Sequence, residues 1–453
     1  MFSRKINRYL QDWSKSSFRK PLLIRGARQV GKTTAVRMFG QEFDVFIELN
    51  MELDDDRELF ERETDINRLY NLILITKGIA SSAGRVLIFI DEIQHCEKAI
   101  AALRYFYEQR PDLYVIAAGS LLEAFLDRQR IGLPVGRVSS VWMYPLDFEE
   151  FLEAAEQHQL LSELQSLPLK GHLLPAINRW FRQYALIGGM PEIVSAYLKT
   201  NDLSVVRRMQ ADLLVAYDDD MIKYAQTRDQ ADIIRLIWSF LPTVVCKQVS
   251  YSGFGKLKLR TESVRSAMRI LELCGLVYRV SPYTTYELPA LLDYSKKVKL
   301  LMLDTGLLNY LAGVQAEYFG SQSLNSIYKG AAMEHLIGQL LISQGGEEIM
   351  PLSYWQRDKR GSSAEIDYVY RHRGKLIPIE VKAGACGTLK SLHLFMENSP
   401  QDLAIRFYDG EFWVQSVERK EGKAFTLLNI PLALVGNLKE YVLMYSGAAE
   451  PSQ

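Results

Sequence analysis

A glycine-rich stretch near the N-terminus combines the residue types that bind phosphate. Residues 26–33 read GARQVGKT and fit the pattern G-x-x-x-x-G-K-[ST], between a predicted strand and a predicted helix. Glycines let backbone N–H groups wrap phosphates, and the N-terminus of the helix adds partial positive charge. Lys32 can reach the β- and γ-phosphates, and the Thr33 hydroxyl can ligate Mg²⁺. The predicted ATP-binding residues are Gly26, Ala27, Arg28, Gln29, Val30, Gly31, Lys32, Thr33 and Thr34.

An acidic pair follows a second apolar strand. The run Val86–Ile90 ends in Asp91 and Glu92, and ligands of open α/β sheets bind at such carboxyl ends of strands. We predict that Asp91 holds Mg²⁺, directly or through water, and that Glu92 polarises an attacking water. A solvated acidic turn is the alternative. Because the phosphate-binding pattern lies upstream, we favour hydrolysis.

Two further residues are candidates for the same site. Ser120 follows the run Tyr114–Ala118, so it could touch the γ-phosphate or the water; an ordinary turn is the alternative. Arg137 precedes the next apolar run and could stabilise charge that develops on the γ-phosphate, in its own chain or in a neighbouring copy. A surface salt bridge is the alternative for Arg137.

A second group of acids and a lysine lies in the C-terminal third. Glu380 and Lys382 are two apart on a predicted strand and so share one face, and a hairpin brings Asp367 beside them. Asp367 and Glu380 could bind a second divalent cation, Lys382 could orient water, and Glu334 on the preceding helix would add an acid. Such a set suits metal-assisted phosphodiester cleavage. A solvated charged face is the alternative, and the nearby Glu365 leaves the roles of the acids open.

Composition limits what kind of protein carries these sites. The chain has 453 residues, 48% of them hydrophobic and 24% charged, which is typical of about three globular domains. Equal numbers of basic and acidic residues, 54 of each, exclude a globally basic nucleic-acid binder but not a local basic patch. Four well-separated cysteines disfavour a disulfide framework. With no signal-peptide pattern and no apolar run near ~20 residues, we expect a cytoplasmic protein without a membrane contact.

The apolar pattern predicts an α/β N-terminal domain over residues 1–145 and a helical lid over residues 146–227, interrupted at Gly188–Pro191. Short apolar runs that alternate with amphipathic stretches predict a mostly parallel sheet. These five runs are Leu22–Arg25, Val45–Leu49, Val86–Ile90, Tyr114–Ala118 and Val138–Met143.

Residues 228–300 are predicted to form three helices and a strand pair, the order of a winged helix-turn-helix. The predicted third helix is Ser263–Cys274, and the strands are Leu276–Val280 and Tyr286–Leu288. Residues 301–445 are predicted to be α/β again, before a loose tail from Ser446. Their predicted elements are a helix at Tyr328–Gln344 and strands at Ile366–Arg371, Lys375–Lys382, Ala404–Tyr408 and Phe412–Val417.

The segment from Lys247 to Leu300 is basic, with ten Lys or Arg residues and four acids. Aromatic residues are interleaved with these charges, so a winged helix here could dock in a DNA groove. Packing between domains, with the charges solvated or facing acids, is the alternative. The acidic stretch Asp44–Asp65 is a candidate partner, within the chain or between subunits.

Several motifs together resemble the prokaryotic AAA-type ATPases. They are GARQVGKTT, LIFIDEIQ, AAGSLLE and VGRV, with LIGGMPEIV matching a Gly-Gly-x-Pro-Glu signature of the helical segment. The C-terminal half resembles domain of unknown function 4143, which commonly accompanies such ATPases, and AEID with PIEVK looks like the PD-(D/E)xK nuclease core. The resemblance implies a P-loop ATPase domain, a helical lid, a winged helix and a restriction-endonuclease-like α/β domain. It also implies the roles given above for Asp91 and Glu92.

The sequence therefore predicts Mg²⁺-dependent ATP hydrolysis that is coupled to DNA or other nucleic-acid binding through the winged helix and the nuclease-like domain. Nuclease activity and a homo-oligomer are left open, because cores of this fold can survive as binding scaffolds. The alternative is a nucleotide-controlled switch for a protein partner, in stress or defence signalling, with a silent nuclease-like scaffold. A small-molecule kinase is a weaker third hypothesis, since the acidic pair suits attack by water better.

Overall fold

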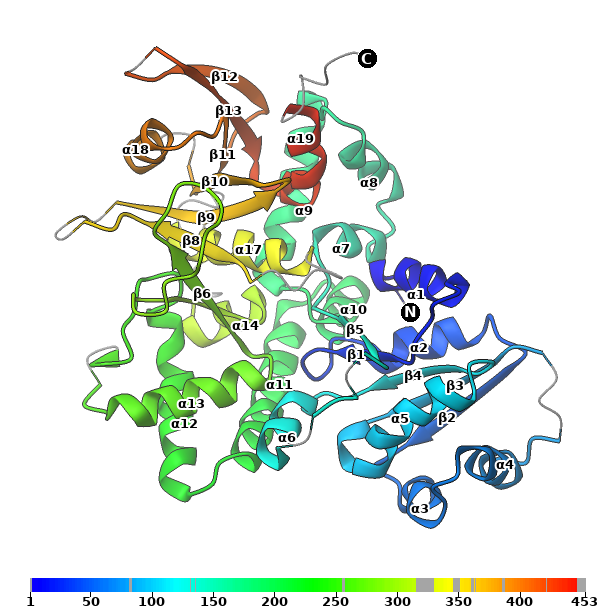
Figure 1. The fold of residues 1–453 in the computed structure, drawn as a ribbon. Coiled ribbons are helices and arrows are strands. Elements are labelled where there is room, and N and C mark those ends of the chain that lie inside the picture. Colours follow the sequence, from blue (N-terminus) through cyan, green and yellow to red (C-terminus); the bar gives the residue numbers. More distant parts are fainter. Residues whose placement is uncertain are drawn as a thin grey trace.

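The protein contains two β-sheets with a largely helical segment between them (Figure 1). The five-stranded N-terminal sheet lies at the lower right of that view and the eight-stranded C-terminal sheet at the upper left. The computed structural model describes residues 2–445 except 81–83, 131, 135, 255–256, 315–329, 345–350, 360–361, 363, 385–387 and 421. The predicted tail from Ser446 lies outside the described residues, as does Lys256 of the basic segment.

The N-terminal sheet is parallel, with the order β2-β3-β4-β1-β5. All five predicted strands are present, and each end lies within one residue of its predicted position. Continuous apolar runs form these strands because both faces of the sheet are covered. The strands are β1 (Leu22–Arg25), β2 (Val45–Asn50), β3 (Val86–Asp91), β4 (Tyr114–Ala118) and β5 (Ser139–Trp142).

Helices cover both faces of this sheet (Figure 1). Side chains alternate along a strand, so Leu22 and Ile24 pack in one core while Leu23 packs in the other. The first core includes α1 (Lys5–Lys15) and α2 (Lys32–Gly40), and the second includes α3 (Asp54–Arg62), α4 (Ile66–Thr76) and α5 (Glu97–Gln109). The helix α6 (Leu122–Gln129) follows β4.

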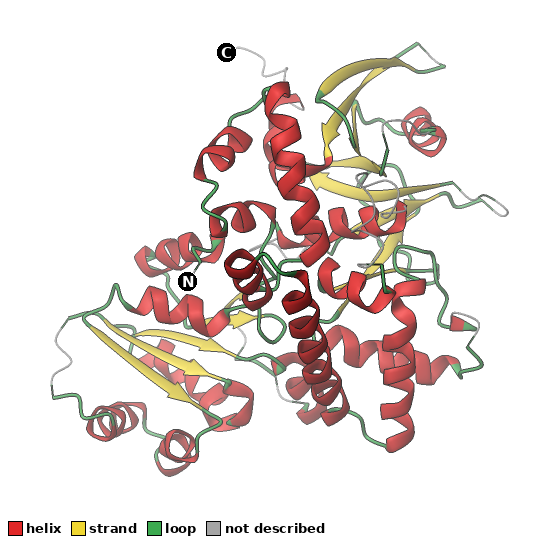
Figure 2. Cartoon of the chain, turned by 180° about the vertical axis from the view of Figure 1, so that it is seen from behind, coloured by secondary structure: helices red, strands yellow, loops and turns green. Residues whose placement is uncertain are grey.

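The middle segment is helical, and the view from behind shows its helices between the two sheets (Figure 2). Asp147 and Glu150 form a reciprocal capping box that begins α7, a feature that stabilises a helix by ~1 kcal/mol. Among the described residues, no helix combines the length and apolar character needed to cross a bilayer. The helices are α7 (Phe148–Ala154), α8 (His158–Gln165), α9 (Leu174–Ile187), α10 (Pro191–Thr200), α11 (Leu203–Lys223), α12 (Arg228–Phe240) and α13 (Thr261–Leu273).

The strand pair predicted for a winged helix belongs instead to the C-terminal sheet. The strand β6 (Val277–Tyr283) pairs with β7 (Lys299–Met302) and, further along, with β8 (Ser353–Gln356). The predicted strand at Tyr286–Leu288 is wrong, because these residues form a bend. Between α12 and α13, the described residues contain 3₁₀ structure at Leu241–Thr243 and at Phe254 but no α-helix. A winged helix is therefore not confirmed, and the predicted boundary at residue 300 falls inside β7.

The C-terminal sheet has the order β12-β13-β11-β10-β9-β8-β6-β7. Its helix α18 (Lys390–Asn398) packs with Trp355 and Ile366 in one core, while α17 (Gly330–Ser343) packs in the large core shared with the middle segment. The remaining elements are β9 (Glu365–His372), β10 (Lys375–Lys382), β11 (Leu403–Tyr408), β12 (Trp413–Glu418), β13 (Ala424–Pro431), α14 (Thr305–Ala312) and α19 (Leu438–Tyr445).

Candidate functional site

The phosphate loop, residues 26–33, turns sharply between β1 and α2. Gly26, Gln29 and Gly31 have positive φ angles of 140°, 63° and 98°. A Cβ atom on Gly26 would lie 2.1 Å from the carbonyl oxygen of Met143, so only glycine fits there. The N-cap residue of α2 is Gly31, so no side chain caps this end of the helix. The first N–H groups of α2 are therefore available to an anion.

The Lys32 ammonium is held inside this loop. Its Nζ donates to the carbonyl oxygens of Gly26 at 3.0 Å and Ala27 at 2.8 Å. Burial lowers the pKa of Lys32 to about 8, although Glu92 and Asp91 act in the opposite direction. A buried cation with only carbonyl partners gains interaction energy when an anion enters.

Thr33 and Asp91 are brought together as predicted for Mg²⁺ ligands. The Thr33 hydroxyl donates to Oδ2 of Asp91 at 2.7 Å. Burial raises the pKa of Asp91, and the hydrogen bond from Thr33 opposes that shift. Hydroxyl and carboxylate oxygens are ligands that Mg²⁺ prefers, so this pair fits the predicted cation. Thr34 is exposed on α2.

Glu92 lies directly beside this pair and is oriented by two donors. Ser120 Oγ donates to Oε2 of Glu92 at 3.2 Å, and Gln94 Nε2 donates to the same oxygen at 2.6 Å. The backbone of Glu92 is left-handed, with φ 49°, a conformation that costs free energy in a non-glycine residue. The predicted Ser120 therefore joins Glu92, while Gln94 was missed although it is only two residues further along.

Arg137 is not part of this site in its own chain. It precedes β5, whose Ser139 pairs with Leu22 at the start of β1, so it lies at the amino edge of the sheet. The phosphate loop leaves the opposite edge. The exposed Arg137 side chain donates to Oε1 of Glu108 at 2.9 Å, which is the salt-bridge alternative. A role in a neighbouring copy remains a prediction.

Arg4 binds the N-terminal segment to the phosphate loop, and no sequence motif indicates this role. Its guanidinium donates to the carbonyl oxygens of Val30 and Tyr144, both at 2.8 Å. It also lies 3.0 Å from the carboxylate of Glu150, with both side chains buried. The contacts with Val30 and Tyr144 span 26 and 140 positions, so no local pattern predicts them.

The helix α11 fastens the loop from another side. Tyr217 donates its hydroxyl hydrogen to the carbonyl oxygen of Arg28 at 2.9 Å. The Arg28 guanidinium lies 3.1 Å from the buried carboxylate of Asp220. The predicted nucleotide contact Arg28 is thus engaged by the helical segment.

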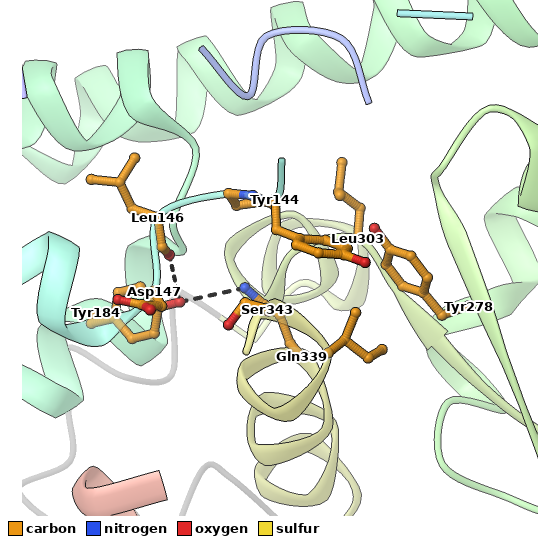
Figure 3. Close-up of a pocket in the computed structure, with 10 residues that line it drawn as sticks. Tyr144, Leu146, Asp147, Tyr184, Tyr278, Leu303, Gln339 and Ser343 are labelled. Atoms are coloured by element: carbon orange, nitrogen blue, oxygen red, sulfur yellow. Dashed lines mark hydrogen bonds between the residues drawn. The ribbon is translucent and has the colours of Figure 1, made fainter. Parts of the chain in front are cut away.

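A buried junction connects the end of the N-terminal domain to the helical segment. Leu146 donates its N–H to Gly189 O at 2.7 Å, and Tyr184 donates its hydroxyl to Leu146 O at 2.8 Å (Figure 3). A Cβ atom on Gly189 would lie 2.1 Å from that oxygen of Leu146. The Gly-Gly-Met-Pro segment is therefore one of the places where the two chain segments are in contact.

The same junction continues into the C-terminal half through Asp304 and α17. The fully buried Asp304 accepts from the N–H of Gly189 at 2.7 Å, and burial raises its pKa to about 6. The next residue, Thr305, donates both its N–H and its hydroxyl to Oε1 of Gln339 on α17, at 2.8 and 2.6 Å. Gln339 also reaches the hydroxyl of Tyr184 at 3.5 Å (Figure 3).

A buried lysine lies among the acids of the predicted nuclease-like site. Lys299 is 1% exposed, and its Nζ lies 2.7 Å from Glu334, 3.5 Å from Glu365 and 3.6 Å from Asp367. We call these four residues the carboxylate cluster. Burial lowers the pKa of Lys299, but the three carboxylates outweigh burial and raise it above its usual range. In the sequence, Lys299 is recognised only as one of the ten bases of the segment Lys247–Leu300.

Glu380 and Lys382 lie beside the cluster but pair with each other. Lys382 Nζ donates to Oε1 of Glu380 at 2.5 Å, and Asp367 accepts from the N–H of Val381 at 2.8 Å. Burial, followed by the charge of Asp367, raises the pKa of Glu380 to about 7. Among the described residues, no three or more His, Cys, Asp or Glu side chains are arranged to hold a metal ion. The expected second cation site is therefore not supported.

Five of the nine described bases of the basic segment lie beside acids. The pairs are Arg265 with Glu262, Arg269 with Asp127, Arg279 with Glu272, and Lys296 with Asp358, while Lys299 lies in the carboxylate cluster. The acidic stretch Asp44–Asp65 forms ion pairs with other bases, namely Arg37, Arg57, Arg62, Lys77 and Lys98. This arrangement matches the alternative in which the segment packs between domains.

Comparisons with known sequences identify three regions. Residues 18–152 match an AAA domain family (AAA_14), residues 178–318 a domain of unknown function (DUF8612), and residues 329–432 a domain of unknown function (DUF4143). A search of curated proteins finds no match.

Two solved structures share parts of the arrangement at low identity. The Walker-type ATPase PABY2304 of Pyrococcus abyssi is 16% identical, with a TM-score of 0.43 over 69% of this chain and 96% of that chain. The Aeropyrum pernix ORC1 protein in complex with DNA is 12% identical, with a TM-score of 0.29 over 68% and 91% of the two chains. The AAA match and the phosphate loop together establish that this chain carries an AAA-type ATPase domain, a fold that implies ATP and usually Mg²⁺.

Proposed function

We propose that this protein hydrolyses ATP at the phosphate loop and uses the nucleotide state to control nucleic-acid binding by its C-terminal half. The observation that carries the coupling is a continuous path of hydrogen bonds. Arg4 joins Val30 to Tyr144, and two residues further along the backbone Leu146 bonds to Gly189. Asp304 and Thr305 extend this path to α17, the helix that also carries Glu334 of the carboxylate cluster.

Each residue of the ATPase site has its own role in hydrolysis. Lys32 binds the phosphates in its charged form, and Thr33 with Asp91 holds Mg²⁺, which supplies charge neutralisation on the phosphate oxygens. Glu92, oriented by Ser120 and Gln94, accepts a proton from the attacking water. The two donors on Oε2 leave its other oxygen to face the water.

The carboxylate cluster serves as a scaffold and not as a nuclease centre in this proposal. The Lys299 ammonium lies within 3.6 Å of three carboxylates, so it takes the place that a hard cation would need. We expect DNA cleavage by the wild-type protein with Mn²⁺ to be no greater than cleavage by the Asp367→Ala, Lys382→Ala double variant. Cleavage that this double variant loses would show that the centre is active.

The test of coupling is reciprocal binding in the full-length protein. DNA affinity is measured with a non-hydrolysable ATP analogue, with ADP and without nucleotide, and Lys32→Ala is the control that should not respond. Coupling between two sites is typically ~5- to 150-fold in affinity, and the analogue should bind more tightly by the same factor when DNA is present. DNA affinity that is identical in all three states would overturn the coupling, and absence of DNA binding would overturn the nucleic-acid part alone.

A nucleotide-controlled protein switch is the second candidate, and the edge strand β12 favours it. This strand pairs only with β13 at the end of the sheet, and its Trp413 and Val414 are 44% and 41% exposed. Edge strands offer free backbone groups to an added strand of a partner. The N–H of Ser416 faces the open edge, because its partner Thr426 bonds toward β11. Ser416→Pro would therefore block such pairing without removing a bond to β13, so a nucleotide-dependent complex that this variant abolishes would support the switch.

A further inference from the structure

A large groove separates the N-terminal domain from the C-terminal sheet, and neither the phosphate loop nor the carboxylate cluster lines it. Its volume is about 980 Å³, at the upper end of the ~300–1,000 Å³ range of ligand pockets. The walls come from the segment that follows β5, the turn from α13 into β6, the end of α17 and the hairpin between β9 and β10. We call it the aromatic groove.

Four aromatic rings line the aromatic groove: Trp142, Tyr144, Tyr278 and Tyr370. None of the four is fully buried. Tyr144 and Tyr278 lie next to each other, with their ring centroids 6.1 Å apart and their planes at 56°. Both rings also line the small neighbouring pocket drawn in Figure 3. Rings spread along a groove in this way are platforms on which unpaired bases stack.

The charge of the lining is positive. Arg279, Arg371, Arg373 and Lys439 line the groove and are exposed, while Glu272 is the one acid among its described lining residues. Four bases stand against this one acid, which lies 3.7 Å from Arg279, so the described lining carries a net positive charge. Cations beside aromatic rings attract the phosphates of a strand whose bases stack.

The groove is joined to the phosphate loop through Arg25 and Arg4. Trp142 pairs with Arg25, the residue before Gly26 of the phosphate loop, and the Arg25 guanidinium lies 5.8 Å from the centroid of the Trp142 ring. The carbonyl oxygen of Tyr144 accepts from Arg4, which also binds the loop at Val30. A ligand that stacks on these rings therefore contacts residues that hold the phosphate loop.

We propose that the aromatic groove binds single-stranded nucleic acid, with phosphates on its arginine and lysine side chains and bases on its aromatic rings. The proposal rests on the proposed function, since it names the site and the substrate class of the nucleic-acid binding. It assigns that binding to the groove, which shares Arg279 but none of the other bases with the basic segment. A duplex keeps its bases stacked inside and cannot use the rings.

The test measures fluorescence anisotropy of a labelled 12-nucleotide oligothymidylate, a 12-base-pair duplex and a poly-aspartate peptide with the full-length protein. The Arg373→Glu, Lys439→Glu variant should bind the oligonucleotide at least ~10-fold more weakly and with a shallower salt dependence. Tyr370→Leu should weaken binding by about tenfold at any salt concentration. Lys258→Glu, Arg260→Glu is the matched control on the basic segment, and this control should keep both oligonucleotide binding and basal ATP turnover.

The possible outcomes distinguish failure of the groove proposal from failure of the proposed function. Oligonucleotide binding that depends on Lys258 and Arg260, but not on the groove, would overturn the groove and leave nucleic-acid binding intact. Tighter binding of the duplex, or binding of poly-aspartate alone, would overturn the single-strand assignment. ATP turnover without any nucleic-acid binding would overturn both the groove and the nucleic-acid part of the proposed function.

Discussion

Two buried lysines near carboxylates have opposite pKa shifts, and the contrast separates the two candidate sites. Lys32 contacts backbone carbonyl oxygens at 2.8–3.0 Å, and burial lowers its pKa to about 8. Lys299 lies 2.7–3.6 Å from three carboxylates, which overcome burial and raise its pKa. The first lysine still lacks an anionic partner and the second already has three.

This difference shows why residue types alone do not define a site. Both regions contain a lysine and acids at the ends or on one face of strands. Beside the phosphate loop, Asp91 accepts a hydrogen bond from Thr33 and Glu92 accepts one from Ser120, so the carboxylate oxygens are placed for a ligand. In the carboxylate cluster the ammonium group of Lys299 is already the cationic partner of the three acids.

The largest expected effect is on stability when Lys299 is removed. Lys299→Met leaves three acids without their cation, and breaking a buried ion pair from one side costs ~3–5 kcal/mol. Urea unfolding measures this loss in the free energy of unfolding. Mn²⁺ should restore part of the stability of the variant and leave the wild type unchanged. If Mn²⁺ stabilises the wild type equally, Lys299 does not occupy the cation position.

The next effect is on catalysis. Glu92→Gln keeps the shape and the contacts of the side chain but removes the proton acceptor, so turnover should fall at least ~100-fold. Affinity for ATP should change by only a few fold, because Lys32 and the loop remain. Steady-state turnover and equilibrium binding are measured in parallel. A variant that loses ATP binding together with turnover would show that Glu92 shapes the loop and does not act on water.

A third prediction concerns the pH dependence of ATP binding. Below pH 8 Lys32 is already charged, so binding is at full strength. Above about pH 8 each binding event must take up a proton, and the Kd should rise by up to ~10-fold per pH unit. In Glu92→Gln the weakening should begin at a lower pH, because the Glu92 charge raises the pKa of Lys32. A Kd that stays constant to pH 10 would contradict the low pKa.

The smallest expected effect is at Arg137. Its partner is Glu108 on the surface, and such pairs contribute ~0–1 kcal/mol, so Arg137→Ala should change turnover less than about fivefold. Turnover is measured across a range of protein concentrations. A larger loss that appears only at high concentration would show that Arg137 acts on a neighbouring copy.

The sequence predicted the N-terminal sheet and most of its site because the determinants are local. Continuous apolar runs mark the buried parallel strands. The glycines between Gly26 and Thr33 indicate a tight turn, because they adopt positive φ angles that other residues rarely adopt. Glu92 and Ser120 were found because both follow strands that end at the same edge of one sheet.

The remaining features depend on contacts between distant residues. Arg4 reaches the phosphate loop and Tyr144 across as many as 140 positions. Lys299 enters the carboxylate cluster from β7, a strand that was not predicted, at the end of the basic segment. The wing itself was mispredicted because β6 pairs with β8, more than 70 residues further along. The hydrophobic periodicity of a single segment does not indicate which distant strand it pairs with.

Counting bound Mn²⁺ in the full-length protein tests the contrast between the two sites most directly. With a non-hydrolysable ATP analogue the wild type should bind one Mn²⁺ per chain, without nucleotide it should bind none tightly, and Lys32→Ala should bind none in either state. A tightly bound Mn²⁺ that needs no nucleotide and disappears in Asp367→Ala would contradict the account, because the carboxylate cluster would then be a metal centre.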